Sequence, residues 1–145
     1  MTATLHWLCL VLLAMLMVAA AVGDWRRFTI PNRLNIAVAA LALPYWLTAG
    51  VPLWPLLGWQ VALALAAFAL FALAFRAGAM GGGDVKLFAA LALWFPTIDY
   101  LRLVLVVTVL GGVLTLLLLL DHKRRGRPGR PEIPYGIAIA LGTVA

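Results

Sequence analysis

The sequence predicts an all-α fold, a polytopic transmembrane helical bundle of about six spans. Two compositional features predict it: 66% of the 145 residues are hydrophobic and only 11% are charged. A soluble domain has about 25% charged residues, and this chain has too few polar side chains to cover a water-exposed surface. The third observation is that long uncharged stretches separate the few charges. We therefore expect residues 1–145 to form one integral-membrane domain.

The uncharged stretches predict the first three helices, because an ionised group at the bilayer centre costs about 3 kcal/mol or more. Trp7 to Gly23 has no charge, and with Leu5 and His6 it reaches about the 20 residues of one crossing. Three arginines follow it and no base precedes it, so we expect a retained helix and not a signal peptide. Leu34 to Phe75 is 42 residues without a charge. Its middle holds turn-forming residues that predict two helices and a tight hairpin: Pro44, Gly50, Pro52 and Pro55.

Two further apolar runs, Leu87 to Ile98 and Leu103 to Leu120, lie on either side of Asp99 and Arg102. The first of them is short for a span unless it begins within the Gly-rich connection that precedes it. A last apolar stretch, Ile133 to Ala145, has 13 residues and is shorter than one crossing.

The basic residues test whether these spans form a consistent topology, because Lys and Arg are retained on the cytoplasmic side. The connections after the second and fourth spans contain only Arg102. Those after the first, third and fifth spans contain the other bases: Arg26, Arg27 and Arg33, then Arg76 and Lys86, then five bases from Lys123 to Arg130. This pattern predicts a periplasmic N-terminus and three cytoplasmic loops.

Composition and spacing exclude several function classes. The net charge of +6 is distributed between apolar runs, which favours anionic lipid headgroups over nucleic acid as counterions. His6, Cys9 and His122 are scattered, without the spacing of a metal site. A nucleotide-binding loop of the Gly-x-x-x-x-Gly-Lys-Ser/Thr type is lacking. We expect no metal, no cofactor and no nucleic acid.

Two acidic residues are candidates for chemistry. Asp24 directly follows the first apolar run and Asp84 follows three glycines, so the topology places both at the cytoplasmic membrane boundary. Two partly desolvated carboxylates close together share a proton, and one can then act as a base while the other acts as an acid. The alternative is that each is a solvated boundary residue, as most aspartates at the ends of spans are.

The local sequences resemble those of the type IV prepilin peptidases, the GxGD class of intramembrane aspartyl proteases. In that family one catalytic Asp precedes an Ile/Leu-Pro-Asn/Asp element, as Asp24 precedes Ile30-Pro31-Asn32 here. The second closes Gly-x-Gly-Asp, often with Lys two residues later, as in Gly81-Gly82-Gly83-Asp84-Val85-Lys86. A third element, Pro131-Glu132-Ile133-Pro134-Tyr135-Gly136, looks like the Pro-rich segment that opens the family's last helix.

The resemblance implies that Asp24 and Asp84 are the catalytic pair of an aspartic endopeptidase, with residues 1–145 as a single peptidase domain. It does not say which carboxyl is the base. It implies motif-support or substrate-binding roles for Gly81, Gly82, Gly83, Lys86, Pro31, Asn32, Pro134 and Gly136. The substrate would be a prepilin-like protein, cut between its basic leader and its hydrophobic transmembrane helix in a bacterial inner membrane.

Several roles stay open on the residues alone. The glycines could form an unrestricted loop, with positive φ or a close approach to substrate, or they could serve tight helix packing, as the Gly78 and Gly82 spacing suggests. Lys86 could favour the ionised form of Asp84 or anchor the chain at the headgroups. Pro31 could set the direction of Asp24 or only begin the second helix.

The chain departs from longer prepilin peptidases in lacking paired cysteines, which are associated there with N-methylation. It therefore resembles the short, peptidase-only forms of Flp/Tad pilus systems, and we do not expect methyltransferase activity. Two other functions remain: a small proton-coupled transporter that uses the same aspartates, and a non-catalytic scaffold for pilus assembly. Neither the cognate prepilin nor the oligomeric state can be inferred from the sequence.

Overall fold

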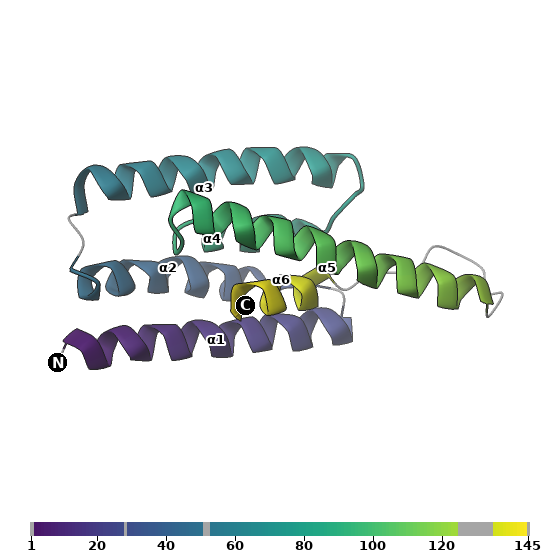
Figure 1. Ribbon diagram of the computed structural model, residues 1–145, viewed down its shortest axis with the longest axis horizontal. Helices are drawn as coiled ribbons and strands as arrows, with labels where there is room; N and C mark the ends of the chain where they lie inside the picture. The colour runs from purple at the N-terminus through teal and green to yellow at the C-terminus, as the bar shows by residue number, and fades with distance from the viewer. Residues whose placement is uncertain (1, 28, 51–52, 125–134, 145) are drawn as a thin grey trace.

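The computed structural model describes residues 2–27, 29–50, 53–124 and 135–144 (Figure 1). These residues form helices, as the fold class predicted. The helices are α1 (Thr2–Arg27), α2 (Asn32–Thr48), α3 (Leu53–Arg76), α4 (Gly82–Leu91), α5 (Thr97–Arg124) and α6 (Tyr135–Val144).

The connections differ from those expected in two places. Pro44 does not end a helix but lies inside α2, and the turn comes at Gly50, whose φ of 66° suits glycine. The helix α4 does begin within the Gly-rich segment, as a fourth span would need. It ends at Leu91, however, so Asp99 and Arg102 lie inside the start of α5 and not in the connection before it.

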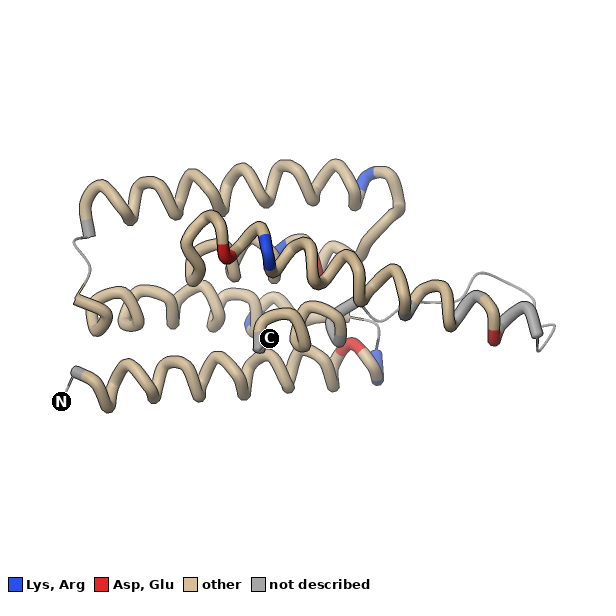
Figure 2. Tube along the Cα trace, viewed as in Figure 1, with Lys and Arg blue, Asp and Glu red and all other residues tan. Residues whose placement is uncertain are grey.

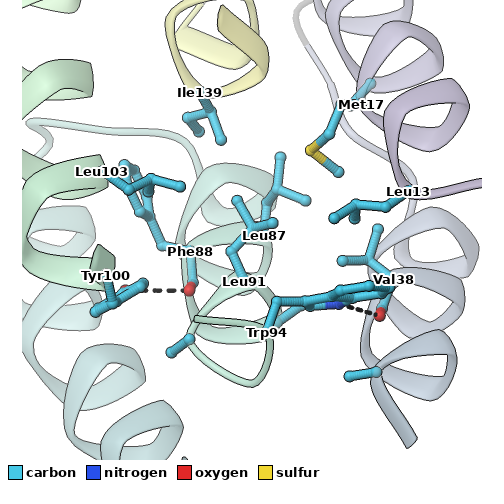
Figure 3. Close-up of a cluster of buried hydrophobic side chains, with 14 of the residues drawn as sticks. Leu13, Met17, Val38, Leu87, Phe88, Leu91, Trp94, Tyr100, Leu103 and Ile139 are labelled. Atoms are coloured by element: carbon cyan, nitrogen blue, oxygen red, sulfur yellow. Dashed lines mark hydrogen bonds between the residues drawn. The ribbon is translucent and has the colours of Figure 1, made fainter. Parts of the chain in front are cut away.

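The short helix α4 lies at the centre of the bundle. It packs against α2, α3 and α6, while α1 packs against α2 and α6, and α5 packs against α6. Leu87 and Leu91 of α4 are completely buried, and they meet Leu13 and Met17 of α1 and other apolar side chains in the core (Figure 3). The core-facing side of α4 is therefore covered by protein, although the helix is too short to cross a bilayer alone.

Side-chain hydrogen bonds connect the helices through backbone carbonyls. The indole Nε1 of Trp94 donates to the Val38 carbonyl over 2.9 Å, and the Tyr100 hydroxyl donates to the Phe88 carbonyl over 3.1 Å (Figure 3). Gln60 of α3 donates to the Phe95 carbonyl over 2.9 Å. A buried polar group without a partner costs free energy in an apolar environment, so these bonds let tryptophan, tyrosine and glutamine occupy the core.

The outer surface is apolar, as a membrane protein requires. Among the described residues, three helices are long and apolar enough to cross a membrane: Ala3–Arg27, Trp54–Arg76 and Thr97–Leu117. Large side chains such as Leu65, Leu70 and Leu105 on these helices are more than 60% exposed. The chain is therefore an all-α membrane-type protein, in which α2, α4 and α6 are shorter than the three long helices.

Most of the charged residues on α1 to α4 gather at one end of the bundle (Figure 2). This end holds the C-terminal ends of α1 and α3 and the N-terminal ends of α2 and α4, because the consecutive helices run in opposite directions (Figure 1). Asp24 and Asp84 both belong to this end by their positions in α1 and α4. The alternating directions of the helices thus bring the two aspartates to one end of the bundle.

Candidate active site

Asp24 occupies the last turn of α1, and it is only 5% exposed. Leu13, Met17 and Ala20 precede it at spacings of three and four residues and are also buried. Such spacing places all four residues on one face of the helix. Asp24 thus continues the core-facing stripe of α1 and does not point into solvent, unlike the neighbouring arginines.

Asp84 lies in the first turn of α4, outside the three long apolar helices, and is 6% exposed. Its Oδ2 atom lies over Gly81, so close that a β-carbon built on Gly81 would approach it to 2.9 Å. The Gly81 backbone forms a hydrogen bond with the carboxyl group. Its Oδ1 atom is buried and has no hydrogen-bond partner among the described residues.

The electrostatics of Asp84 show that the two carboxyl groups interact. Burial raises the pKa of Asp84 from 3.8 to about 7, and the negative charge of Asp24 is the second cause of the rise. The hydrogen bond with Gly81 opposes both effects. An aspartate with this pKa is protonated about half of the time near neutral pH, so this site can hold a proton beside a second carboxyl group.

Close packing at Gly83 brings α4 up to the connection between α1 and α2. A β-carbon on Gly83 would lie 2.9 Å from the Cβ of Ile30 and 3.1 Å from its backbone nitrogen and oxygen. Backbone atoms cannot move aside as the end of a flexible side chain can, so only glycine fits here. Gly83 therefore sets how closely Asp84 approaches the segment that follows Asp24.

Pro31 precedes the first residue of α2, with extended backbone angles of φ −68° and ψ 143°. Its carbonyl accepts hydrogen bonds from the backbone of Leu34 and Asn35. The proline thus separates α1 from α2 and begins the second helix, and the turn before it presents Ile30 to Gly83. Of the two roles considered for Pro31, this geometry shows the start of the second helix.

Lys86 and Asn32, two further residues of the motifs, contact each other. The Lys86 ammonium donates to the Asn32 side-chain oxygen over 2.8 Å at an exposed position. Residues two apart on a helix point about 200° apart. Lys86 and Asp84 therefore lie on opposite faces of α4. This arrangement connects the first turns of α2 and α4 at the charged end of the bundle.

Gly81, Gly82 and Gly83 do not form the unrestricted loop with positive φ that the sequence analysis considered. Gly81 is extended, with φ −76°, and Gly82 and Gly83 already belong to α4. The positive φ of this connection occurs at Gly78, at 71°, and Gly78 lies outside a helix, so Gly78 and Gly82 do not form one helix face. Close packing is the observed role of Gly83. Pro134 lies outside the described residues, and Gly136 belongs to α6.

Asn35 is a site residue that the sequence analysis did not identify. It is 5% exposed, and its Nδ2 donates to the Gly83 carbonyl over 3.2 Å. Its Oδ1 has no partner among the described residues. The available signal was its position three residues after Asn32, on the same helix face, inside an otherwise apolar stretch where a polar residue needs a reason to be present.

The fold and this site together define a helical membrane protein with two buried, interacting carboxyl groups at one end of its bundle. The comparison with protein families is more specific. Residues 10–119 match the model of the type IV leader peptidase family, which is most of the chain, and the protein belongs to that family. It is therefore a membrane peptidase. Neither a curated protein nor a solved structure matched the chain.

Proposed function

We propose that this protein is an aspartic prepilin peptidase in which Asp24 and Asp84 are the catalytic pair. The observation that carries the proposal is the position of the two side chains: both are buried at the same end of the bundle, and the charge of one acts on the other. Burial and a like charge are the conditions under which a carboxyl pair retains one proton near neutral pH.

The pair would hydrolyse a peptide bond by general acid–base catalysis. The ionised carboxylate takes a proton from water as the water oxygen attacks the peptide carbonyl carbon, and the protonated carboxyl group donates its proton to the carbonyl oxygen. In the second step the amine nitrogen receives a proton from the carboxyl group that had acted as the base, and the C–N bond breaks. The other carboxylate takes a proton from one hydroxyl group of the intermediate, so that a carboxylic acid forms and the pair again holds one proton. Because the two groups titrate as a pair, neither is assigned as the initial base.

The substrate that fits this site is a prepilin-type precursor with a basic leader and an apolar transmembrane helix. Asp24 and Asp84 lie where long apolar helices give way to basic residues, so the reacting bond would be at the boundary between membrane and cytoplasm. A precursor whose leader remains in the cytoplasm and whose helix is inserted has its junction at the same depth. The proposed location is a bacterial inner membrane, with the charged end facing the cytoplasm.

Cleavage of a co-expressed Flp-type prepilin tests the proposal, followed by gel shift and mass spectrometry. Wild-type enzyme should remove the leader, and Asp24→Asn and Asp84→Asn should each abolish removal while still inserting in the membrane. Asp99→Asn is the matched control, because Asp99 is an exposed aspartate on α5. Cleavage that survives either substitution in the pair would refute the mechanism.

The same variants separate the two other functions. A scaffold would retain pilus assembly with asparagine at both positions and would not cleave the precursor. A transporter would depend on a proton gradient, whereas hydrolysis should continue in detergent micelles, where no gradient exists.

A further inference from the structure

An open groove runs between α2 and α3, with α4 as its floor. Its volume is about 480 Å³, within the range of about 300–1,000 Å³ that is typical of ligand sites. The walls are apolar and include small residues, which leave the space unfilled: Ile36, Ala39, Ala64, Phe68, Ala89 and Leu93. We call this space the α2–α3 groove.

One end of the groove is polar, and it is the end nearest the aspartate pair. Asn35 and Lys86 line it there. The buried Oδ1 of Asn35 lacks a partner among the described residues, while the other side-chain atom of this amide is bonded to Gly83, next to Asp84 in the chain. A buried acceptor without a donor is costly, so this end suits a ligand that brings an N–H group.

The two faces of α4 divide the groove from the aspartates. Ala89 lies three residues after Lys86, on its face of the helix, and Leu93 follows the end of α4; both line the groove. Asp84 belongs to the opposite, core-facing side of α4. A chain that lies in the groove reaches Asp84 by passing over the N-terminal end of α4. Gly81, just before that end, is exposed and places no side chain over the Oδ2 atom of Asp84, which a β-carbon there would approach to 2.9 Å.

We propose that the α2–α3 groove binds the apolar helix of the substrate, with the first turn of that helix at Asn35. This inference rests on the proposed function and names the surface that holds the substrate. The first four N–H groups of any helix have no partner within it, and one of them would satisfy Asn35 Oδ1. The apolar side chains of the substrate helix would fill the groove along α3, on the side of the bundle that faces lipid.

Charge sets the direction of the bound substrate. The exposed ammonium group of Lys86 lines the polar end of the groove, and it disfavours a basic leader inside the groove. The apolar helix therefore occupies the groove, and the leader leaves over the end of α4 toward the aspartates. The scissile junction, which lies between the two parts, is then carried past Gly81 to Asp84.

Cysteine crosslinking in membranes tests the docking without relying on catalysis. The native Cys9 is first replaced by alanine, and a cysteine is placed near the start of the apolar helix of a co-expressed Flp-type prepilin. Leu65→Cys, in the groove, should form a disulfide with it. Leu70→Cys is the matched control, because both leucines are similarly exposed, 65% and 63%, and lie about 140° apart around α3.

A second variant measures the effect on cleavage. Ala64→Phe places a ring in the groove and should raise KM for the full precursor about tenfold, which corresponds to about 1.4 kcal/mol. It should leave cleavage of a short peptide that spans the junction but lacks the helix unchanged. Leu70→Phe should change neither value.

The outcomes distinguish the docking from the function. Two crosslinking results would overturn the docking: equal disulfide formation at both positions, or none at Leu65→Cys. It would also be overturned if photoactivatable phospholipid labelled the groove and the prepilin did not. An unchanged KM for Ala64→Phe, with wild-type cleavage intact, would also overturn it. Selective crosslinking without cleavage by the wild-type enzyme would instead refute the proposed function and leave the docking standing.

Discussion

Replacing Asp84 by asparagine should stabilise the protein at high pH and leave its stability nearly unchanged at low pH. The folded protein holds the pKa of Asp84 at about 7, against an ordinary value of 3.8. Between these values the folded state binds a proton that the unfolded state has released. Stability is therefore fully present below pH 3.8 and falls as the pH rises through 7.

The size of this effect follows from the same shift. One pKa unit corresponds to 1.36 kcal/mol, so the rise costs the folded state at most about 4 kcal/mol at pH 8. Asparagine has nearly the same shape and no charge, and it removes this cost. The pH dependence that remains in Asp84→Asn belongs to the other titrating groups.

Thermal unfolding in detergent micelles, followed by circular dichroism, measures the effect at about pH 4 and pH 8. The unfolding midpoint of Asp84→Asn should exceed that of wild type at pH 8 and match it at pH 4. Asp99→Asn removes an exposed carboxylate in a surface ion pair, worth at most about 1 kcal/mol. Equal midpoints for wild type and Asp84→Asn at pH 8 would refute the argument from burial.

Three further substitutions test the packing around the site. Gly83→Ala should destabilise the protein by about 1–3 kcal/mol and slow leader removal. Its control is Gly112→Ala, where nothing lies within 4 Å of the added carbon, and this change should be neutral or stabilising. Equal unfolding midpoints for the two variants would contradict the close packing at Gly83. Tyr100→Phe removes the buried donor to the Phe88 carbonyl and should cost about 1 kcal/mol in chemical unfolding. Lys86→Gln should change the unfolding free energy by less than about 1 kcal/mol, because its bond is exposed, and a larger loss would show that its charge is structural.

Much of the fold could be predicted because the membrane limits the possible structures. Charged residues cannot lie at the centre of a bilayer without cost, so the uncharged stretches predicted the helical class and the position of α1 closely. The hairpin was placed correctly in outline, but Pro44 was a misleading turn signal. A proline inside a helix leaves one backbone carbonyl without its usual donor, and such prolines are tolerated in membrane helices.

The helix boundaries around α4 could not be predicted from hydropathy. The charges Asp99 and Arg102 were expected to mark a connection, yet they lie within the first turns of α5. Helix geometry allows charged side chains at the end of a span to point toward water. The connection comes earlier, after Leu91, at a position where the sequence remains apolar.

The sequence by itself determined the membrane-embedded helical class and the two aspartates worth testing, because charge and apolar length act locally along the chain. Only the tertiary structure decided that Asp24 and Asp84 are buried together, that Gly83 packs on the backbone of Ile30, and that Asn35 supports the site from another helix. These are contacts between residues far apart in the chain. They depend on which helix faces meet, and no local pattern of hydropathy specifies that.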